Sequence, residues 1–228
     1  DDTIIFDKSF TSGSHSGELH GGAGTADVID LSAYGYGLNA AFENTNAAIR
    51  TQYDSDVNGA GTVYTLVTDL TGFEIAIGTD YGDKIAGTSG AETFTGGTGD
   101  DTADYTGAAS IAVTFTDKDN QTVVTNSETD VLVDVENITG TAGDDTYVLD
   151  STILDDLVGD SQFFDAAGST LDTVRVTGTI DFEASKLAQL FTNIEQIDLG
   201  EVFVPNDLDL AETKCRIMLI TGPNMAGK

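Results

Sequence analysis

Carboxylate side chains recur at a fixed interval in the middle of this chain. Between Gly78 and Asp104, three nine-residue segments follow one another, and each carries an acid at its sixth position: Asp83, Glu92 and Asp101. Each segment also opens with glycine and has an apolar residue at its eighth position. Ca²⁺ binds about six to eight oxygen ligands, which carboxylates and backbone carbonyls can supply. The spacing therefore predicts stacked turns that bind calcium.

The same period predicts the elements that position these acids. The first six positions of a segment suit a turn, because glycine tolerates backbone angles at which a side chain would clash. The last three suit a short strand, in which alternate side chains face opposite sides. Ile85, Phe94 and Ala103 are therefore expected in a thin core, with the flanking residues outside.

Two segments would complete one coil, which places the first and third turns on one edge and the second turn on the opposite edge. Asp83 and Asp101 would then face each other across one strand spacing, roughly 4.8 Å. Like charges this close repel unless a cation lies between them. We therefore expect these two acids to clamp one ion and Glu92 to contribute on the other edge.

The segments resemble the repeats of the RTX family (repeats in toxin, or haemolysin-type calcium-binding repeats), whose unit is Gly-Gly-x-Gly-x-Asp-x-apolar-x. Residues 96–104 fit the unit fully, whereas the first segment has Tyr81 at a glycine position and the second has Glu92 in place of Asp. Residues 140–148 form an isolated unit that lacks only the second glycine. Residues 21–27 form another, with one extra residue before its acid. Connecting tracts such as 70–74 and 135–140 extend the resemblance over roughly residues 1–200.

The resemblance implies an all-β fold: a parallel β-roll or β-helix-like segment with additional β-strands and one short helix. It also implies Ca²⁺ as the bound cofactor. An alternative is that the Gly-Asp turns merely join ordinary antiparallel strands, and residues 21–27 could keep the turn without the ion. Together, the spacing and the resemblance predict these metal ligands: Asp27, Asp83, Glu92, Asp100, Asp101 and Asp145.

Four parts of the chain are expected. They are an N-terminal β region with a degenerate repeat (1–77), the β-roll repeats (78–104), a C-terminal β region with one further repeat at 140–148 (105–200), and a tail (201–228).

Within the β regions, residues 182–194 are expected to be helical, because apolar residues four apart line one face. Residues 38–53 are ambiguous between helix and strand, and the pair Asp155/Asp156 reads as a solvated turn.

Acids outnumber lysine plus arginine by 39 to 9, which gives a formal charge of −30 on 228 residues. Self-repulsion of this size disfavours a compact state, and bound divalent cations relieve it. A disordered acidic chain is the competing interpretation, but 39% hydrophobic content and regular strand patterns argue against it. The same charge makes nucleic acid an unlikely partner for residues 1–200.

The only cysteine is Cys215, so no intrachain disulfide can form. Calcium would stabilise a secreted protein that lacks disulfides. No apolar run approaches membrane-spanning length, and the N-terminus lacks the features of a cleavable signal peptide. The RTX resemblance implies export by type I machinery that reads a C-terminal signal. We therefore expect a piece of a longer protein that is secreted or lies on the bacterial cell surface.

The tail differs in composition, since residues 201–228 hold four acids, three bases and both prolines. Its end, from Gly222 through Gly227 to Lys228, matches the phosphate-binding pattern Gly-x-x-x-x-Gly-Lys after an apolar strand. This segment resembles the ATPase domain of the MutS DNA mismatch-repair family. No Ser or Thr follows Lys228 to hold Mg²⁺, so we expect an incomplete nucleotide site. A fusion remnant, a gene-level chimera and a misassigned sequence remain open, and residues 216–221 could add one strand to a sheet whatever their origin.

No catalytic constellation is recognisable. Zinc-protease and nucleophile motifs are missing, and both histidines lie in a Ser- and Gly-rich stretch. The acid pairs Asp100/Asp101 and Asp144/Asp145 have the residue types of a glycosidase pair. Both fall at positions five and six of repeat units, so contact with metal or solvent explains them better.

The leading hypothesis is therefore a non-enzymatic, calcium-dependent structural or adhesive module, which could also make cell-surface or self-assembly contacts. Its acidic chain would close around ions outside the cell. The alternatives are an ATP-binding DNA-repair fragment, indicated by the tail, and a non-catalytic segment of a secreted polysaccharide-modifying enzyme or protease.

Overall fold

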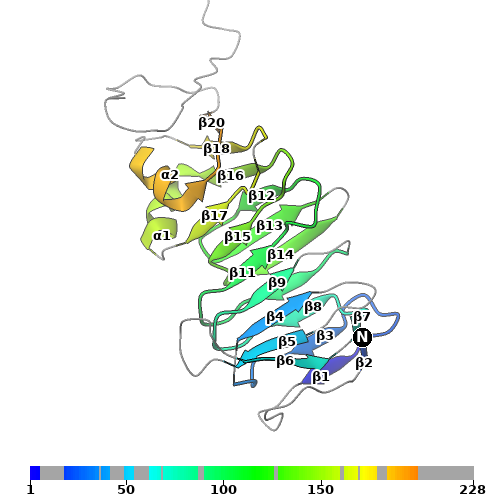
Figure 1. Cartoon of the computed structure of the whole chain (residues 1–228). Coiled ribbons are helices and arrows are strands. Elements are labelled where there is room, and N and C mark those ends of the chain that lie inside the picture. Colours follow the sequence, from blue (N-terminus) through cyan, green and yellow to red (C-terminus); the bar gives the residue numbers. More distant parts are fainter. Residues whose placement is uncertain are drawn as a thin grey trace, which may run out of the picture.

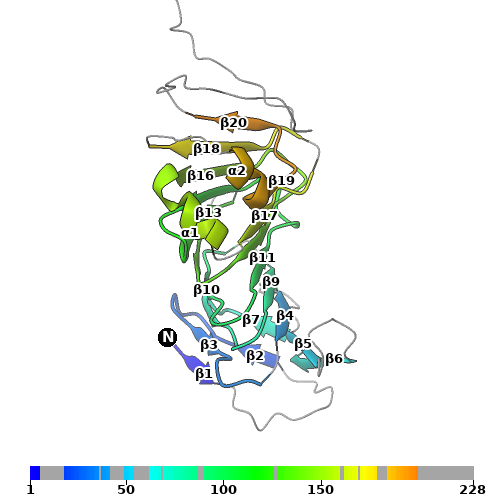
Figure 2. The same cartoon turned by 90° about the vertical axis from the view of Figure 1, so that its left-hand side faces the viewer.

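Two facing β-sheets, between which the chain repeatedly alternates, form most of this computed structural model (Figures 1 and 2). The structure describes residues 1–5, 18–35, 37–41, 49–53, 62–67, 69–86, 90–125, 128–159, 162–168, 170–178 and 184–199. The all-β class is confirmed. Among the described residues, no helix is both long enough and apolar enough to span a bilayer.

The larger sheet has ten strands and the smaller has eight, and a separate pair consists of β2 (Glu18–His20) and β7 (Asp69–Thr71). In spatial order, the ten-stranded sheet contains β1 (Thr3–Ile5), β3 (Val28–Asp30), β8 (Ile75–Ile77), β10 (Thr93–Thr95), β14 (Thr129–Val133), β13 (Asn120–Val124), β12 (Ala112–Phe115), β16 (Thr146–Asp150), β18 (Thr173–Thr177) and β20 (Gln196–Asp198). The eight-stranded sheet contains β19 (Phe191–Thr192), β17 (Phe163–Asp165), β15 (Asn137–Thr139), β11 (Thr102–Asp104), β9 (Lys84–Ala86), β4 (Leu38–Ala41), β5 (Ile49–Tyr53) and β6 (Thr62–Val67).

The nine-residue period produces the expected coil, which we define as one strand in each sheet. Ile75 of β8 pairs with Thr93 of β10, and Lys84 of β9 pairs with Thr102 of β11, both in parallel. Each pair is offset by 18 residues, or two nine-residue units. These parallel pairings contradict the alternative that the Gly-Asp turns of residues 78–104 join antiparallel strands.

The inward residues of these coils are those that the period predicts. Ile85, Phe94 and Ala103 are all buried, whereas Lys84 is exposed and Thr93 is half-buried. Each strand thus contributes a single side chain to the space between the sheets. The repeat core is consequently thin.

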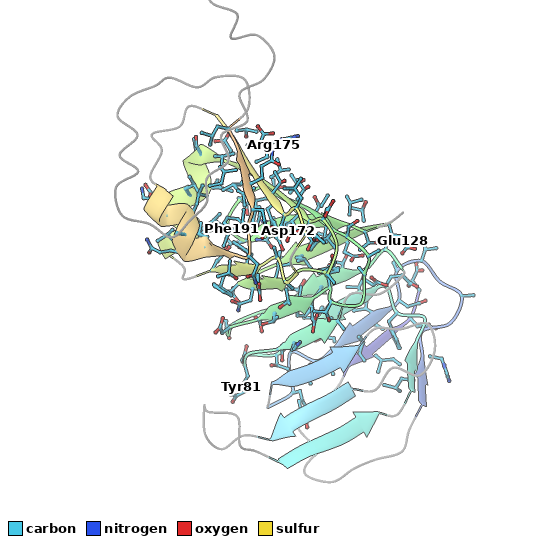
Figure 3. All side chains as sticks on the ribbon, turned by 45° about the horizontal axis from the view of Figure 1, so that its top comes forward. Tyr81, Glu128, Asp172, Arg175 and Phe191 are labelled. Atoms are coloured by element: carbon cyan, nitrogen blue, oxygen red, sulfur yellow. The ribbon has the colours of Figure 1, made fainter. Side chains whose placement is uncertain are left out.

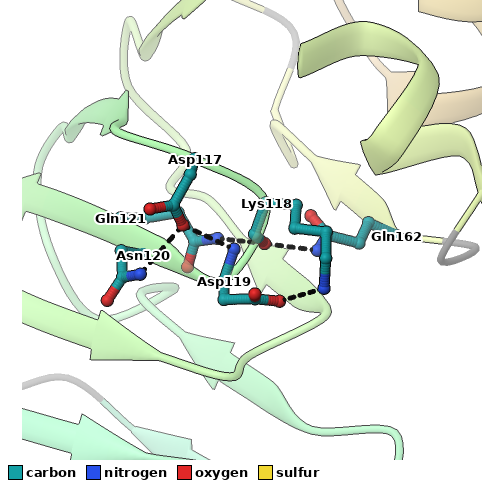
Figure 4. A network of polar contacts seen from close by, with 6 residues as sticks. All are labelled: Asp117, Lys118, Asp119, Asn120, Gln121 and Gln162. Atoms are coloured by element: carbon teal, nitrogen blue, oxygen red, sulfur yellow. Dashed lines mark hydrogen bonds and ion pairs between the residues drawn. The ribbon is translucent and has the colours of Figure 1, made fainter.

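An antiparallel excursion interrupts the larger sheet. Strand β12 pairs with β13, and β13 pairs with β14, both antiparallel, while β14 returns to pair in parallel with β10. In the turn between β12 and β13, the Asn120 amide donates to Asp117 at 2.8 Å (Figure 4). Gln121 and Gln162 both donate to the Lys118 carbonyl, at 3.0 and 2.6 Å. Gln162 directly precedes β17, so the excursion is anchored to a later coil.

Helical residues occur only in the later coils of the described chain. A 3₁₀ turn, Ser151–Ile153, leads into α1 (Leu154–Gly159), and α2 (Ala184–Leu190) packs against α1, β17 and β19 (Figures 1 and 2).

The predictions of local structure are partly corrected by these elements. Asp155 and Asp156 lie in the first turn of α1, so they are not a solvated loop turn. Helix α2 matches the helix expected within residues 182–194 but ends at Leu190, because Phe191 starts β19. The ambiguous tract 38–53 forms β4 and β5 where it is described, and residues 42–48 lie outside the described residues.

Candidate cation-binding corners of the coils

The acids at position six occupy what we call corners, the residues directly before the strands of the coils. Asp83 and Asp101 precede β9 and β11, and their exposed fractions are only 2% and 0%. A buried carboxylate is costly unless it is neutralised or well hydrogen-bonded. The partners of each carboxylate oxygen therefore decide what a corner can bind.

Consecutive corners are joined by hydrogen bonds from backbone to side chain. Leu38 N donates to Asp83 Oδ1 at 2.7 Å, Asp83 N donates to Asp101 Oδ1 at 2.7 Å, and Asp101 N donates to Glu136 Oε2 at 2.9 Å. Each acid thus satisfies the backbone N–H of the residue aligned with it one coil earlier, which is Leu38, Asp83 or Asp101. We call such a series a carboxylate ladder, and this one runs along the eight-stranded sheet.

Two more carboxylate ladders follow the ten-stranded sheet. In the first, Asp2 N donates to Asp27 Oδ1 at 2.5 Å and Asp27 N donates to Glu74 Oε2 at 2.9 Å. In the second, Ile111 N donates to Asp145 Oδ1 at 2.8 Å, Asp145 N donates to Asp172 Oδ1 at 2.7 Å, and Asp172 N donates to Glu195 Oε2 at 3.0 Å. All three ladders end in glutamate.

Glu92 belongs to a separate pair. Its N–H donates to Asp130 Oδ1 at 3.0 Å, and the Tyr105 hydroxyl donates to Asp130 Oδ2 at 3.0 Å. The strand after Glu92 lies in the ten-stranded sheet, whereas the strands after Asp83 and Asp101 lie in the eight-stranded sheet. Burial raises the pKa of Asp130 above its usual range.

Burial also dominates the electrostatics of the ladders. It raises the pKa of Asp83 to about 6, although hydrogen bonds from Thr79 and Leu38 oppose the shift. It raises the pKa of Asp101 to about 7, with repulsion from Asp83 and Glu136 adding to the effect. Burial and the neighbouring carboxylates raise the pKa of Asp172 to about 6. These corners therefore hold negative charge unfavourably when no cation is bound.

Threonine satisfies the second carboxylate oxygen in two corners. Thr79 N donates to Asp83 Oδ2 at 2.6 Å, and the Thr79 hydroxyl donates to Asp83 Oδ1 at 3.0 Å. Thr141 N and its hydroxyl donate to Asp145 Oδ2 and Oδ1 at 2.7 and 2.8 Å. We call these closed corners. In the corner of residues 21–27, Gly24 N donates to Asp27 Oδ2 at 3.1 Å.

Two other corners keep one oxygen without a donor. Asp101 Oδ2 and Asp172 Oδ2 are buried and have no hydrogen-bond partner within the described part of the chain, and both residues are 0% exposed. We call these open corners. Figure 3 shows Asp172 within the stack, whereas Tyr81 points outward from its edge.

The donor chemistry of the open corners fits calcium. A Cβ built on Gly96 would lie 2.5 Å from Asp101 Oδ2 and 2.1 Å from the Asp134 carbonyl oxygen. Two oxygen atoms of the kind that ligate Ca²⁺ therefore lie close to this glycine. No group of three or more His, Cys, Asp or Glu side chains forms a metal cluster among the described residues. Backbone carbonyls would therefore have to complete the ligand set.

The structure brings only some of the predicted ligands together. Asp83 and Asp101 are neighbours in one ladder, whereas Glu92, Asp27 and Asp145 lie in three other groups. Asp100 is exposed and accepts a hydrogen bond from the Asn137 amide at 2.6 Å. The P-loop-like residues Gly222, Gly227 and Lys228 lie outside the described residues.

Sequence reasoning missed the acids that extend the ladders. The signal is present, since three of the glutamates follow an apolar residue and precede another by two positions, as in Val135-Glu136-Asn137-Ile138. Such tracts look like connectors because they lack the glycines of the repeat. The missed acids are Glu74, Glu136, Asp172 and Glu195 in the ladders, and Asp130 in the separate pair with Glu92.

Comparison with known proteins yields a short similarity to a DNA mismatch repair protein. No family model matches the chain. The chain is 53% identical to the DNA mismatch repair protein MutS of Cytophaga hutchinsonii over 34 residues, which are 15% of this chain and 4% of that protein. The match therefore spans a small fraction of the MutS length.

Proposed function

We propose that this chain is a calcium-binding structural module of a bacterial secreted or cell-surface protein, and that its folding is coupled to Ca²⁺ binding. The supporting observation is the buried Oδ2 of Asp101, which has no donor in the described structure and sits in the one repeat unit that fits the RTX pattern fully. A buried anionic oxygen without a donor requires a proton or a cation.

In this proposal, Asp101 and backbone carbonyls near Gly96 hold one ion. Bound Ca²⁺ supplies positive charge that offsets carboxylate repulsion. The chain's own contribution is to present hard oxygens at a corner from which water is excluded. Because the ion binds the folded form, it adds folding free energy to a chain with a formal charge of −30.

Asp101→Asn tests this proposal directly. Asparagine keeps an oxygen that can accept from Asp83 N, at 2.7 Å in the wild type, but it removes the anionic oxygen that would face the ion. We expect the number of calcium ions bound to fall by one and the calcium-induced rise in Tm to shrink. Calorimetric titration with CaCl₂ and thermal unfolding with and without chelator measure both effects.

The matched control is Asp156→Asn, which removes one negative charge from the exposed first turn of α1. It should leave calcium binding unchanged. The proposal fails if the wild type shows no calcium-dependent change in Tm, or if Asp101→Asn binds as many ions as the wild type.

The similarity to MutS supports a second candidate, nucleotide binding by residues 222–228. In this candidate Lys228 contacts phosphate, as in loops of the same pattern. Titration of the whole chain with ATP, with Lys228→Ala as the comparison, tests it. Micromolar affinity that the substitution abolishes would favour this candidate, whereas no measurable binding would dismiss it.

A further inference from the structure

We propose that the hydroxyl of Tyr147, a core residue, binds a second calcium ion together with the carboxylate of Asp172. This ion would lie beneath the connection of residues 166–172, inside the later coils and apart from the repeats of residues 78–104. The proposal rests on calcium binding as the proposed function and adds a site to the one at Asp101. Its ligands are oxygens of three kinds: a carboxylate, a phenol hydroxyl and backbone carbonyls.

The Tyr147 side chain reaches from one sheet to the other. Tyr147 belongs to β16 of the ten-stranded sheet, faces inward and is 0% exposed. A Cβ built on Gly140 would lie 2.9 Å from the Tyr147 hydroxyl and 3.0 Å from the Ala166 carbonyl oxygen. Gly140 and Ala166 directly follow β15 and β17 of the eight-stranded sheet. The hydroxyl therefore lies close to the point at which the chain leaves the eight-stranded sheet.

Strand register brings Asp172 to the same part of the coil. Tyr147 pairs with Val174, which follows Asp172 by two residues. Two residues before Tyr147, Asp145 N donates to Asp172 Oδ1 at 2.7 Å. The connection that starts with Ala166 ends at Asp172, directly before β18. Tyr147 thus lies one strand away from Asp172, with its hydroxyl beside the start of the connection that Asp172 ends.

Three buried side-chain oxygens in this area have no hydrogen-bond partner in the described chain. They are Tyr147 Oη, Asp172 Oδ2 and Thr170 Oγ1. Buried polar atoms are nearly always satisfied, so unsatisfied oxygens that share one connection and the adjacent strand indicate a ligand. A buried tyrosine in this fold can bond a carboxylate directly, since the Tyr105 hydroxyl donates to Asp130 Oδ2 at 3.0 Å. Tyr147 does not do so, which leaves its oxygen for an ion.

The local charge favours a divalent cation over a bridging water. Burial raises the pKa of Tyr147, and three nearby carboxylates, among them that of Asp172, raise it further. The hydroxyl therefore stays neutral and offers an oxygen lone pair. Burial, with repulsion from Asp145 and Glu195, raises the pKa of Asp172 to about 6. A water would complete hydrogen bonds here, but only a cation also offsets the repulsion between the carboxylates.

Tyr147→Phe is the decisive variant, because it removes the hydroxyl and keeps the buried ring. In chelator, we expect Tm to rise by roughly 2–6 °C, since a buried hydroxyl without a partner is lost. In CaCl₂, we expect one ion to bind at least about tenfold more weakly and the calcium-induced rise in Tm to shrink. Thermal unfolding and calorimetric titration with CaCl₂ measure these effects. A hydroxyl with a purely structural role would not produce changes of opposite sign in the two media.

Two further variants sharpen the test. Asp172→Asn keeps an oxygen that can accept from Asp145 N but removes the anionic oxygen, so it should weaken the same ion. Combining it with Tyr147→Phe should therefore affect one ion and not two. Tyr105→Phe is the matched control, because it removes a buried hydroxyl that already has a carboxylate partner. It should lower Tm in both media and leave the number of bound ions unchanged.

The proposal is overturned if Tyr147→Phe binds every ion with wild-type affinity, because the hydroxyl would then contact water alone. It is also overturned if this variant is less stable than the wild type in chelator, or if the double variant loses two ions. Loss of an ion in Asp101→Asn but not in Tyr147→Phe would refute this site alone. Absence of calcium binding by the wild type would refute the proposed function as well.

Discussion

The coils from β8 to β11 and those from β15 to β19 share one alternation between the sheets but differ in what stabilises them. In the first region, paired residues are 18 positions apart and each strand contributes one inward side chain. In the second, Asn137 pairs with Phe163 and Phe164 with Phe191, so a coil takes 26 or 27 residues. The extra length holds α1 and α2.

The later region contains a cluster of packed aromatic rings, which the described residues of the repeats do not show. The ring centroids of Phe115 and Phe164 are 4.8 Å apart, those of Phe164 and Phe191 are 5.2 Å apart, and Tyr147 lies 5.3 Å from Phe191. Aromatic burial contributes large stabilisation that needs no ion. The comparison indicates that short coils depend on their corners, whereas long coils also depend on their core.

Phe164→Ala should have the largest effect, because Phe164 is fully buried and its truncation leaves a cavity in the aromatic core. We expect a loss of about 3–5 kcal/mol in the free energy of unfolding, of similar size with calcium and with chelator. Urea unfolding measures it, and Phe163→Ala is the control because Phe163 is 42% exposed. A loss confined to the chelated protein would show that the two regions are not stabilised separately.

Lowering pH should stabilise the metal-free repeats by an intermediate amount. Burial raises the pKa of Asp83 to about 6 and that of Asp101 to about 7, so between about pH 4 and 7 the folded state binds protons that the unfolded state releases. This contribution is fully present below about pH 4 and is lost as pH rises through 6 to 7.

In chelator, we therefore expect the free energy of unfolding to be on the order of 2 kcal/mol higher at pH 5 than at pH 8. Urea titrations at both pH values measure the difference, and Asp101→Asn should reduce it. Equal or greater stability at pH 8 would contradict the role assigned to the buried corners.

Lys84→Met should have the smallest effect. Lys84 Nζ lies 2.6 Å from Asp104 Oδ2 on the outer face of the repeats, with Lys84 47% exposed. Although partial burial opposes it, hydrogen bonds from Lys84 and Thr106 hold the pKa of Asp104 below its usual value. Solvent screens this pair, so we expect a change of about 0–1 kcal/mol that disappears in high salt. A larger loss in thermal unfolding would mean that outer-face charges, as well as corners, stabilise the short coils.

The sequence predicts the coil of residues 78–104 well, because a strict period fixes both the strand register and which side chains point inward. The inward positions of Ile85, Phe94 and Ala103 follow from it directly. The antiparallel excursion could not be predicted, since the alternation in β12, β13 and β14 is the same for parallel and antiparallel partners.

The corners were only partly predictable. The sixth position identifies Asp83 and Asp101, but it gives no sign that the Asp83 carboxylate accepts from Thr79. That contact depends on the turn folding back over four residues. Asp172 gives no such signal in the sequence, because its unit lacks most of the glycines of the repeat.

The antiparallel strands β12, β13 and β14 also make the two sheets unequal in length. From β10 to β18 the larger sheet advances by five strand spacings, whereas from β11 to β19 the smaller sheet advances by three. At roughly 4.8 Å per spacing, the larger sheet is about 10 Å longer than the smaller one over this stretch. The long axis of the stacked coils must consequently curve toward the smaller sheet. Coils added after β20 would therefore extend in a different direction from the early coils.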